Sequence, residues 1–424
     1  MKIVLFEDEQ CADLYPLTFL RPVFDLRCGV FTLKEKIEKK FPNCRVYMET
    51  RDELDGVTAE KYGGEVVNSH DAVLADDDML LVDAGAILTS EAPAYTEGEK
   101  VGVTDGGRFV WAYLKRETVE RLDSTACIGL AEAATRELSP QIVHDVLIRY
   151  PWDLIAHNPE QITRDFAEYY VPERKSEPLR GSAMMGPTEN LYIGEDVELQ
   201  PHTLVDCRKG PVILSDGVLV SAHTSIHGPA FLGEGTRLFE AKIREGCSFG
   251  PVCRVGGEVE ESIIHGYSNK YHTGFLGHSY VCEWVNLGGM TSNSDLKNDY
   301  SNVILQVGGK QVDSGQLKVG CFIGDHTKTS IGTLLNTGSI MGIMCNLVAG
   351  PTVLPKYIPS FAWYVQGRIS KGLGIDYALR TAEASMSRRG VEATEAMVDL
   401  IKHSEEITRE ERLQLVQKHR KRIR

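Results

Sequence analysis

Residues 214–238 read LSDGVLVSAHTSIHGPAFLGEGTRL, and an aliphatic residue returns at every sixth position of this stretch. Between these positions stand mostly Gly, Ser, Asp, Thr and Glu. Neither an amphipathic helix nor an alternating strand keeps a period of six. A hexapeptide β-solenoid does, because each of its flat faces turns one aliphatic side chain inward. The recurring residues are Leu214, Val220, Ile226, Leu232 and Leu238.

The same period recurs in three further registers between about residues 190 and 355. Four registers make chance spacing of aliphatic residues in a β-rich domain a poor alternative. Residues near 254–270 and 296–318 break the period, and such insertions are expected to project as loops from one edge of a solenoid. The further registers are Ile193, Leu199 and Val205; Phe275, Val281 and Leu287; and Ile323, Thr329, Leu335, Met341, Leu347 and Val353.

The first 170 or so residues have a different, α/β pattern. Residues 2–6, 43–48 and 79–82 are short apolar runs suited to buried strands. Strands and helices that follow one another in this order predict an open parallel sheet, which binds ligands at the carboxyl ends of its strands.

Two helices are predicted in this part of the chain. One covers residues 31–41, with Thr32 as its N-cap and Glu35 three residues further on. The other covers residues 141–157 and is interrupted at Pro151.

Composition limits the kinds of partner. The chain has 424 residues, 42% apolar and 25% charged, and a formal net charge of -14. This balance is typical of a globular protein and argues against general binding to nucleic acid or to an anionic membrane. It leaves room for a local basic pocket that holds a small phosphorylated molecule.

Cysteine usage and the apolar runs suggest a compartment. The ten cysteines form no CxxC pair, the first residues lack the apolar core of a signal peptide, and no run is long enough to span a membrane. We therefore expect a cytoplasmic protein with reduced thiols. The residues after about 370 have helical spacing and are expected to form a helical tail.

The densest group of chemically useful side chains lies at residues 269–295. His272 is suited to act as a base near neutral pH, Lys270 to hold a phosphate, and the Asn286 amide to contact a sugar hydroxyl or an acyl oxygen. A surface histidine on a turn is the alternative for His272. Because His272 and Asn286 stand less than one coil apart, two subunits side by side could bring them together.

These segments resemble the acetyltransferase half of the bifunctional N-acetylglucosamine-1-phosphate uridyltransferase/glucosamine-1-phosphate acetyltransferase family. The matching runs are 269–278 (NKYHTGFLGH), 285–289 (VNLGG) and 293–295 (NSD). The resemblance implies a left-handed parallel β-helix that works as a homotrimer and uses acetyl-CoA.

The same resemblance assigns roles to single residues. His272 would deprotonate the sugar amine, Asn286 would contact the sugar, and Asn293 would orient the substrate or the base. Gly289 and Ala349 would lie near the pantetheine of acetyl-CoA. The chain departs from the family where Phe275 replaces a tyrosine and His278 replaces an aspartate.

Residues 14–22 (LYPLTFLRP) resemble the opening motif of sugar-phosphate nucleotidyltransferases. The resemblance implies that Thr18 and Arg21 help to bind a nucleoside triphosphate and a sugar-1-phosphate, and that Asp83 is a Mg²⁺ ligand. A turn residue after a strand is the alternative for Asp83. The glycine-rich loop of that family is replaced by residues 6–10 (FEDEQ), whose carboxylates would repel a triphosphate.

Together these patterns predict a nucleotidyltransferase-like α/β domain at 1–175, a β-helix at 185–365 and a helical tail at 366–424. The leading hypothesis is a two-activity enzyme of nucleotide-sugar synthesis, of the kind that supplies UDP-N-acetylglucosamine. A single-activity enzyme, in which the other domain binds ligand or shapes the trimer, is the second hypothesis. A trimeric scaffold without enzymatic activity is the third.

Overall fold

The N-terminal part is built on a six-stranded mixed sheet. The computed structural model describes residues 1–69, 77–89, 98–122, 126–170, 181–350 and 353–422. The strand order is β4-β1-β5-β8-β7-β9, and β4, β1 and β5 are mutually parallel. The strands are β1 (Lys2–Phe6), β4 (Arg45–Glu49), β5 (Met79–Asp83), β7 (Lys100–Val103), β8 (Phe109–Leu114) and β9 (Pro140–Ile142).

The prediction of a purely parallel sheet was wrong, whereas the three predicted strands are present as β1, β4 and β5. β8 runs antiparallel to both β5 and β7. The antiparallel pairing with β7 follows from the tight turn at residues 104–108, where the Thr104 amide donates to the Arg108 carbonyl. A turn this short can join only antiparallel neighbours.

The two helices predicted in this part have different outcomes. In α1 (Leu33–Lys40), Thr32 and Glu35 form the expected capping box. Residues 141–157 are not one helix, because α6 (Pro151–Tyr169) begins at Pro151 rather than being interrupted there. Proline favours the first helical position, where its missing N–H has no intrahelical partner. The other α-helices among the described residues of this part are α2 (Asp55–Tyr62), α4 (Arg116–Leu122) and α5 (Cys127–Glu137).

From residue 183 the chain winds into a parallel β-helix, as predicted. Val212 pairs with Ala230 on the next coil, and Ala230 pairs with Cys247 on the one after. One face of the prism is a nine-stranded parallel sheet. Its strands are β12 (Leu191–Ile193), β15 (Val212–Leu214), β18 (Ala230–Leu232), β20 (Cys247–Phe249), β22 (Ile263–Ile264), β25 (Tyr280–Val281), β29 (Cys321–Ile323), β32 (Ser339–Met341) and β34 (Tyr357–Ile358).

The other two faces of the prism are connected by β19 (Arg237–Ile243) and β21 (Arg254–Glu260), which are long enough to take part in both. One of these faces later forms the candidate site, and it carries β13 (Glu198–Leu199), β16 (Leu219–Val220) and β23 (Asn269–Lys270). The other carries β11 (Ala183–Met185), β14 (Leu204–Asp206), β17 (Ser225–His227) and β24 (Phe275–Gly277). Shorter pairs follow: β26 (Ser292–Asn293) with β31 (Leu334–Leu335), and β30 (Lys328–Thr329) with β33 (Asn346–Leu347), β35 (Trp363–Val365) and β36 (Arg368–Ser370).

The six-residue registers describe the core of the prism, except at two places where the register slips; Ile193 and Leu199 on the first coils pack against the core but are half-buried. All five residues of the 214–238 register are fully buried in one apolar cluster. In the later registers Leu276 is buried instead of the half-buried Phe275, and Leu354 is buried instead of Val353, which is 46% exposed. The chain slips by one residue at both points, so the neighbouring aliphatic side chain turns inward.

The two predicted insertions have different outcomes. Residues 254–270 are not a projecting loop, because β21, β22 and β23 stay in the coil. Residues 296–318 do leave the coil and contain the hairpin of β27 (Ile304–Val307) and β28 (Lys310–Asp313).

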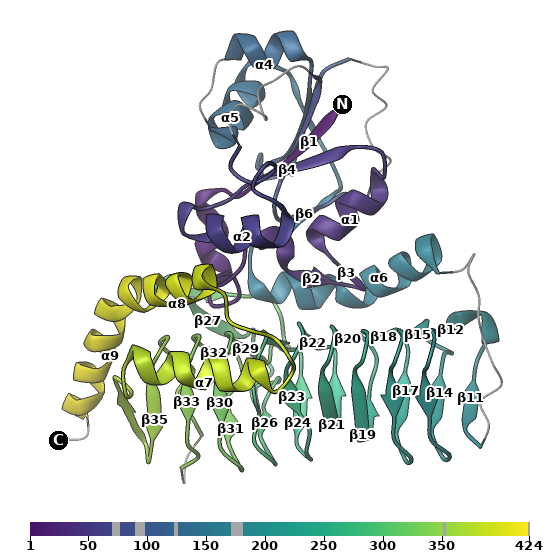
Figure 1. Ribbon diagram of the computed structural model, residues 1–424, viewed down its shortest axis with the longest axis vertical. Helices are drawn as coiled ribbons and strands as arrows, with labels where there is room; N and C mark the ends of the chain where they lie inside the picture. Colours follow the sequence, from purple (N-terminus) through teal and green to yellow (C-terminus); the bar gives the residue numbers. More distant parts are fainter. Residues whose placement is uncertain (70–76, 90–97, 123–125, 171–180, 351–352, 423–424) are drawn as a thin grey trace.

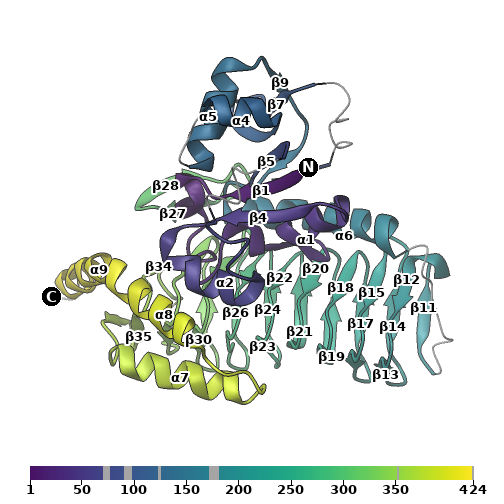
Figure 2. The ribbon, with the colours of Figure 1, turned by 45° about the horizontal axis from the view of Figure 1, so that its top comes forward.

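The N-terminal domain lies beside the β-helix, and α6 runs along the solenoid between them (Figure 1). The tail forms α7 (Ile375–Ser387), α8 (Glu395–Ile407) and α9 (Arg409–Arg422). Figure 2 shows α7 beside the last coils, while α8 lies close to α2 of the N-terminal domain. A shared apolar cluster, which includes Leu54, Met344 and Leu400, joins the three parts. Among the described residues, no helix has the length and apolar character needed to cross a membrane.

Candidate functional site

A cavity of about 570 Å³ opens at the carboxyl ends of the parallel strands. Phe6 at the end of β1 pairs with Asp83 at the end of β5, so the residues that follow both strands meet at one edge of the sheet. This is where an open α/β sheet binds its ligands. Asp83, which the sequence analysis singled out as a metal ligand, lines this cavity.

Asp83 is a buried carboxylate inside this cavity. Its Oδ1 accepts a hydrogen bond from the Gly85 amide at 2.8 Å. Burial, assisted by the negative charge of nearby Asp8, raises the pKa of Asp83 to about 7. A divalent cation between these carboxylates would relieve the repulsion, so the residues present fit a metal ion.

The cavity offers two carboxylates of this kind rather than a full protein cage. Among the described residues, no group of three or more His, Cys, Asp or Glu side chains is arranged to hold a metal ion. Mg²⁺ is commonly bound by one or two carboxylates together with substrate phosphates, so Asp8 and Asp83 would be enough protein ligands for it.

Two arginines that the sequence analysis missed also line the cavity. Arg108 follows the Gly106–Gly107 turn between β7 and β8, and Arg136 comes from α5. Arg108 lies 3.7 Å from Asp8. No motif marks either residue, because the turn and the helix are brought to the cavity only by the fold.

The acidic segment that replaces the glycine-rich loop is less repulsive than its sequence suggests. The Glu7 carboxylate accepts hydrogen bonds from the Val23 and Arg51 amides and forms an ion pair with the Arg51 guanidinium. The Glu7 carboxylate is therefore neutralised within the 6–10 segment and does not face a ligand. The carboxylates of Asp8 and Glu9 still line the cavity.

Thr18 and Arg21 are not in this cavity. The Thr18 hydroxyl donates to the Cys11 carbonyl at 3.2 Å. The Arg21 guanidinium is buried against the β-helix, where it pairs with Asp325 at 2.6 Å and with Glu283 at 3.2 Å. The segment that carries the motif thus connects the N-terminal domain to the solenoid.

A second, larger groove of about 1,010 Å³ lies on the β-helix around His272. The His272 side chain is exposed and lies against Gly289 of the next coil. A Cβ atom at residue 289 would meet the His272 side chain at 3.5 Å, so glycine keeps the space beside the imidazole open.

Asn286 stands in the same groove, at the end of a short relay of amides. Arg389 at the end of α7 donates to the Asn269 oxygen at 3.1 Å, and the Asn269 nitrogen donates to the Asn286 oxygen at 3.2 Å. The relay fixes the rotamer of Asn286, and its NH₂ group remains to donate to a ligand. His272 and Asn286 therefore line one groove within a single chain, without a second subunit.

Lys270 has a structural position beneath His272. It stands beside Val255 in the ladder and takes the inward-facing place of an aliphatic residue. Its ammonium donates to the carbonyls of Gly256 at 2.8 Å and His272 at 3.0 Å. Burial lowers the pKa of Lys270 to about 8. The structure thus places this charge under the backbone of the candidate base, away from the open groove.

Asn293 and Ala349 also lie outside the lining of this groove. The buried Asn293 side chain accepts from the Gly277 amide and donates to the carbonyls of Gly277 and Ser294, which clamps neighbouring coils. The Ala349 amide donates to the Ser330 hydroxyl at 2.7 Å.

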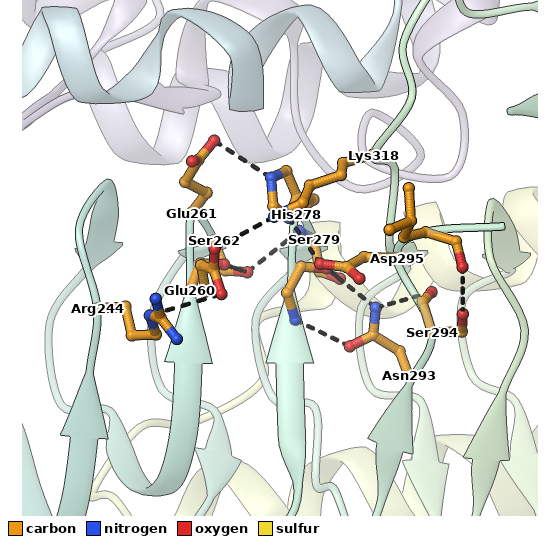
Figure 3. A network of polar contacts seen from close by, with 12 residues as sticks. Arg244, Glu260, Glu261, Ser262, His278, Ser279, Asn293, Ser294, Asp295 and Lys318 are labelled. Atoms are coloured by element: carbon orange, nitrogen blue, oxygen red, sulfur yellow. Dashed lines mark hydrogen bonds and ion pairs between the residues drawn. The ribbon is translucent and has the colours of Figure 1, made fainter. Parts of the chain in front are cut away.

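His278, which departs from the family motif, forms a separate network (Figure 3). Its Nδ1 lies 2.9 Å from Asp295 and its Nε2 lies 3.3 Å from Glu261. Although burial opposes the charge, these two carboxylates raise the pKa of His278 to about 9. The side chain is therefore a buried cation that links coils at the start of the 296–318 insertion, rather than a free base.

Comparison with known proteins relates the N-terminal part to one family. Residues 3–170 match the family model described as sugar nucleotidyl transferase. A bifunctional sugar-1-phosphate nucleotidylyltransferase/acetyltransferase of Sulfurisphaera tokodaii is 35% identical over 96 residues, 23% of this chain and 24% of that protein. The bifunctional protein GlmU of Azoarcus sp. is 29% identical over 136 residues, 27% of this chain and 29% of that protein.

These matches span about a quarter of the length of each relative. Among solved structures, the Arabidopsis UDP-N-acetylglucosamine acyltransferase covers 50% of this chain and 80% of its own, with 14% identity and a TM-score of 0.27. A TM-score this low says nothing about function.

Proposed function

We propose that the protein synthesises nucleotide sugars, because residues 3–170 match the family model described as sugar nucleotidyl transferase. The observation that carries the proposal is Asp83, a buried carboxylate at a strand end inside a cavity that also contains Arg108 and Arg136. A cavity with carboxylates for a metal ion and guanidinium groups for phosphates suits a nucleoside triphosphate and a sugar-1-phosphate.

In the proposed first reaction, an oxygen of the sugar-1-phosphate attacks the α-phosphorus of the nucleoside triphosphate. A new P–O bond forms, the bond to the β-phosphate breaks, and pyrophosphate leaves. Arg108 and Arg136 would orient the phosphates and reduce their mutual repulsion. Mg²⁺ held by Asp8 and Asp83 would neutralise part of the phosphate charge.

In the proposed second reaction, His272 serves as the base of an acetyl transfer. The sugar amine attacks the carbonyl carbon of acetyl-CoA, a C–N bond forms, and the C–S bond breaks to release coenzyme A. The amine proton passes to the imidazole of His272. Asn286 would donate to the sugar, and Gly289 leaves room for the reacting groups. Both relatives carry names that describe bifunctional proteins, and one name pairs these two activities, which supports joining them in one chain.

The first reaction is tested by measuring pyrophosphate release from the full chain. A panel of nucleoside triphosphates and sugar-1-phosphates would be offered with Mg²⁺, to the native protein and to Asp83→Asn. We expect release from at least one pair and a loss of roughly 100-fold or more in the variant. Asp399→Asn, an exposed aspartate of α8, is the matched control. Release that is unchanged in Asp83→Asn would remove Asp83 from the site.

A single-activity enzyme remains the second candidate because of the charge of the N-terminal cavity. Asp8, Glu9, Asp83 and Glu132 line it against only two arginines. Calorimetric titration of nucleoside triphosphates with Mg²⁺ into the full chain tests this candidate. If the cavity is inactive, Arg108→Gln will not change the measured binding.

The homotrimer and the compartment also belong to the proposal. Met290, Ile331 and Leu334 are exposed apolar side chains, 68%, 77% and 49% exposed, and Met290 and Ile331 line the His272 groove. An apolar surface of this kind supports packing against another β-helix. Light scattering on the purified protein tests the trimer. All ten cysteines are free thiols, which supports a reducing, cytoplasmic location.

A further inference from the structure

We propose that the His272 groove binds its acceptor as a nucleoside diphosphate sugar, with the diphosphate held by Arg237, Arg254, Arg388 and Arg389. The inference rests on the proposed acetyl transfer for its chemistry and goes beyond it in the substrate. Nucleotidyl transfer would then precede acetylation, and the product of the N-terminal cavity would be the substrate of the β-helix.

The first support is a group of four guanidinium ions without a carboxylate partner, of which Arg254 donates through one nitrogen to three backbone carbonyls. All four line the groove, and no Asp or Glu side chain is among the lining residues. Within the described part of the chain, none of the four forms an ion pair, although the protein as a whole carries a net charge of -14. Like charges gathered without counter-ions are costly, so the arrangement fits a multiply charged anion.

Burial and mutual repulsion act on the two less exposed members of the group. Burial, together with the charges of Arg389 and Arg237, lowers the pKa of Arg254, and burial with the charges of Arg388 and Arg237 lowers that of Arg389. The Nε of Arg389 is buried and has no hydrogen-bond partner. A bound anion would relieve the repulsion between these guanidinium groups.

The helix dipole explains only part of the group. Arg388 and Arg389 stand at the carboxyl end of α7, where positive side chains are favoured for any helix. Arg237 and Arg254 come from β19 and β21 of the solenoid and share the same groove. The dipole of α7 does not explain why Arg237 and Arg254 lie in the groove.

The ladder of the β-helix sets the spacing between the arginines and the proposed base. Arg237 pairs with Arg254, Arg254 with Asn269, and Asn269 with Asn286 on successive coils. Neighbouring rungs are about 4.8 Å apart. Arg254 therefore lies one rung from the coil that carries His272, and Arg237 lies two rungs from it.

This spacing favours the acceptor over the acyl donor as the source of the diphosphate. In a nucleotide sugar, the two phosphates follow directly on the sugar that carries the amine. In coenzyme A, the long pantetheine arm separates the reacting thioester from the diphosphate. Two rungs of arginine next to His272 suit the first geometry.

An aromatic pair lies in the same groove and suits the nucleobase. The rings of Phe239 and Tyr271 have centroids 4.1 Å apart, and Tyr271 is 41% exposed. Exposed aromatic faces beside arginines are a common platform for a base.

Binding is tested by calorimetry with the full chain. The N-terminal cavity is first weakened by Arg108→Gln with Arg136→Gln, so that the groove dominates the signal. UDP-N-acetylglucosamine, N-acetylglucosamine-1-phosphate and coenzyme A are the probes. We expect UDP-N-acetylglucosamine to bind at least 10-fold more tightly than the sugar phosphate.

Adding Arg237→Gln with Arg388→Gln is expected to weaken UDP-N-acetylglucosamine binding at least 10-fold. Both side chains are exposed, so this pair should fold even if a variant of the half-buried Arg254 does not. Arg208→Gln, on the β-helix outside the groove, is the matched control. Unchanged affinity in the double variant would overturn the proposal. A loss confined to coenzyme A would overturn it as well, by assigning the arginines to the donor.

Acetylation assays separate this inference from the proposed function. Glucosamine-1-phosphate and UDP-glucosamine are offered with acetyl-CoA, and we expect a higher kcat/KM for UDP-glucosamine. A His272-dependent reaction that prefers glucosamine-1-phosphate would overturn the inference and keep the proposed function. If neither acceptor is acetylated, the proposed acetyl transfer fails, while the calorimetry still decides whether the arginines bind a nucleotide sugar.

Discussion

The N-terminal cavity and the β-helix groove have opposite charge and are built in opposite ways. The cavity gathers Asp8 and Asp83 where neighbouring strands end, and needs cations before it can accept phosphates. The groove gathers four arginines and no carboxylate, and can accept an anion directly. The proposed ligands are phosphorylated at both sites, but only the N-terminal cavity would need a metal ion beside its two arginines, whereas the groove would rely on guanidinium groups alone.

The largest expected effect tests whether the two sites are independent. His272→Ala should lower acetyl-CoA turnover by about 10²–10⁴-fold, because the proton of the amine loses its acceptor. Pyrophosphate release at the N-terminal cavity should stay unchanged, because His272 is remote from it. His202→Ala, at an exposed histidine on an early coil, is the control. Acetyl transfer that survives in His272→Ala would end the role assigned to this imidazole.

The requirement of the acidic cavity for Mg²⁺ should depend on pH. Because the pKa of Asp83 is raised to about 7, this carboxyl is largely protonated below pH 7 in the absence of a cation. Protons then compete with Mg²⁺, so the Mg²⁺ concentration for half-maximal pyrophosphate release should fall up to about 10-fold per pH unit between pH 5.5 and 7 and level off above. A requirement that does not change with pH would show that Asp83 does not hold the metal.

The connection between the two regions is expected to depend on one buried ion pair. Asp325→Asn should lower the free energy of unfolding by about 3–5 kcal/mol, because it leaves the buried Arg21 guanidinium with Glu283 as its one carboxylate partner. Differential scanning calorimetry would measure the loss, and Asp399→Asn is again the exposed control. A loss equal to that of the control would mean that the pair does not hold the domains together.

The smallest effect concerns the stability of the β-helix itself. The pKa of His278 rises from 6.5 to about 9 on folding, so its stabilisation is fully present below pH 6.5 and is lost as the pH rises to about 9. The change should be up to about 3 kcal/mol, measured by urea unfolding between pH 6 and 9.5. His278→Gln should flatten the profile. An equally steep profile in the variant would assign the dependence to other groups.

Local patterns predicted most of the fold. The six-residue period identified the β-helix because each inward place of the prism must hold an apolar side chain, as Val220 and Ile226 do. It failed at Val353 and Phe275 because the chain slips by one residue at each point. The next residue, which is also apolar, then takes the inward place, so the sequence pattern does not reveal the slip. The antiparallel β8 was missed because strand direction depends on how the chain returns, not on the strand's own residues.

The candidate sites were predicted less completely. Asp83 and His272 were recognised because each stands in a motif next to a strand or coil. Arg108, Arg136 and the four arginines of the groove stand in no motif. Arg108, Arg136, Arg388 and Arg389 come from a turn or a helix that is distant in sequence from Asp83 or His272, so no spacing could reveal them. Arg237 and Arg254 stand on the coils before His272, where they are not part of the six-residue aliphatic register.

The sequence by itself determined the coil, the capped helix and the edge of the sheet where a carboxylate follows a strand. These depend on interactions between residues near one another in the chain, or on a period that repeats along it. The tertiary structure alone decided which side chains remain available for chemistry. It placed Lys270 and Asn293 in the solenoid and Arg21 in the junction between domains, and it brought Arg389 from the tail to the groove. Whether a polar side chain finds partners in the interior or remains open to a ligand depends on contacts between distant segments, and these exist only in the folded chain.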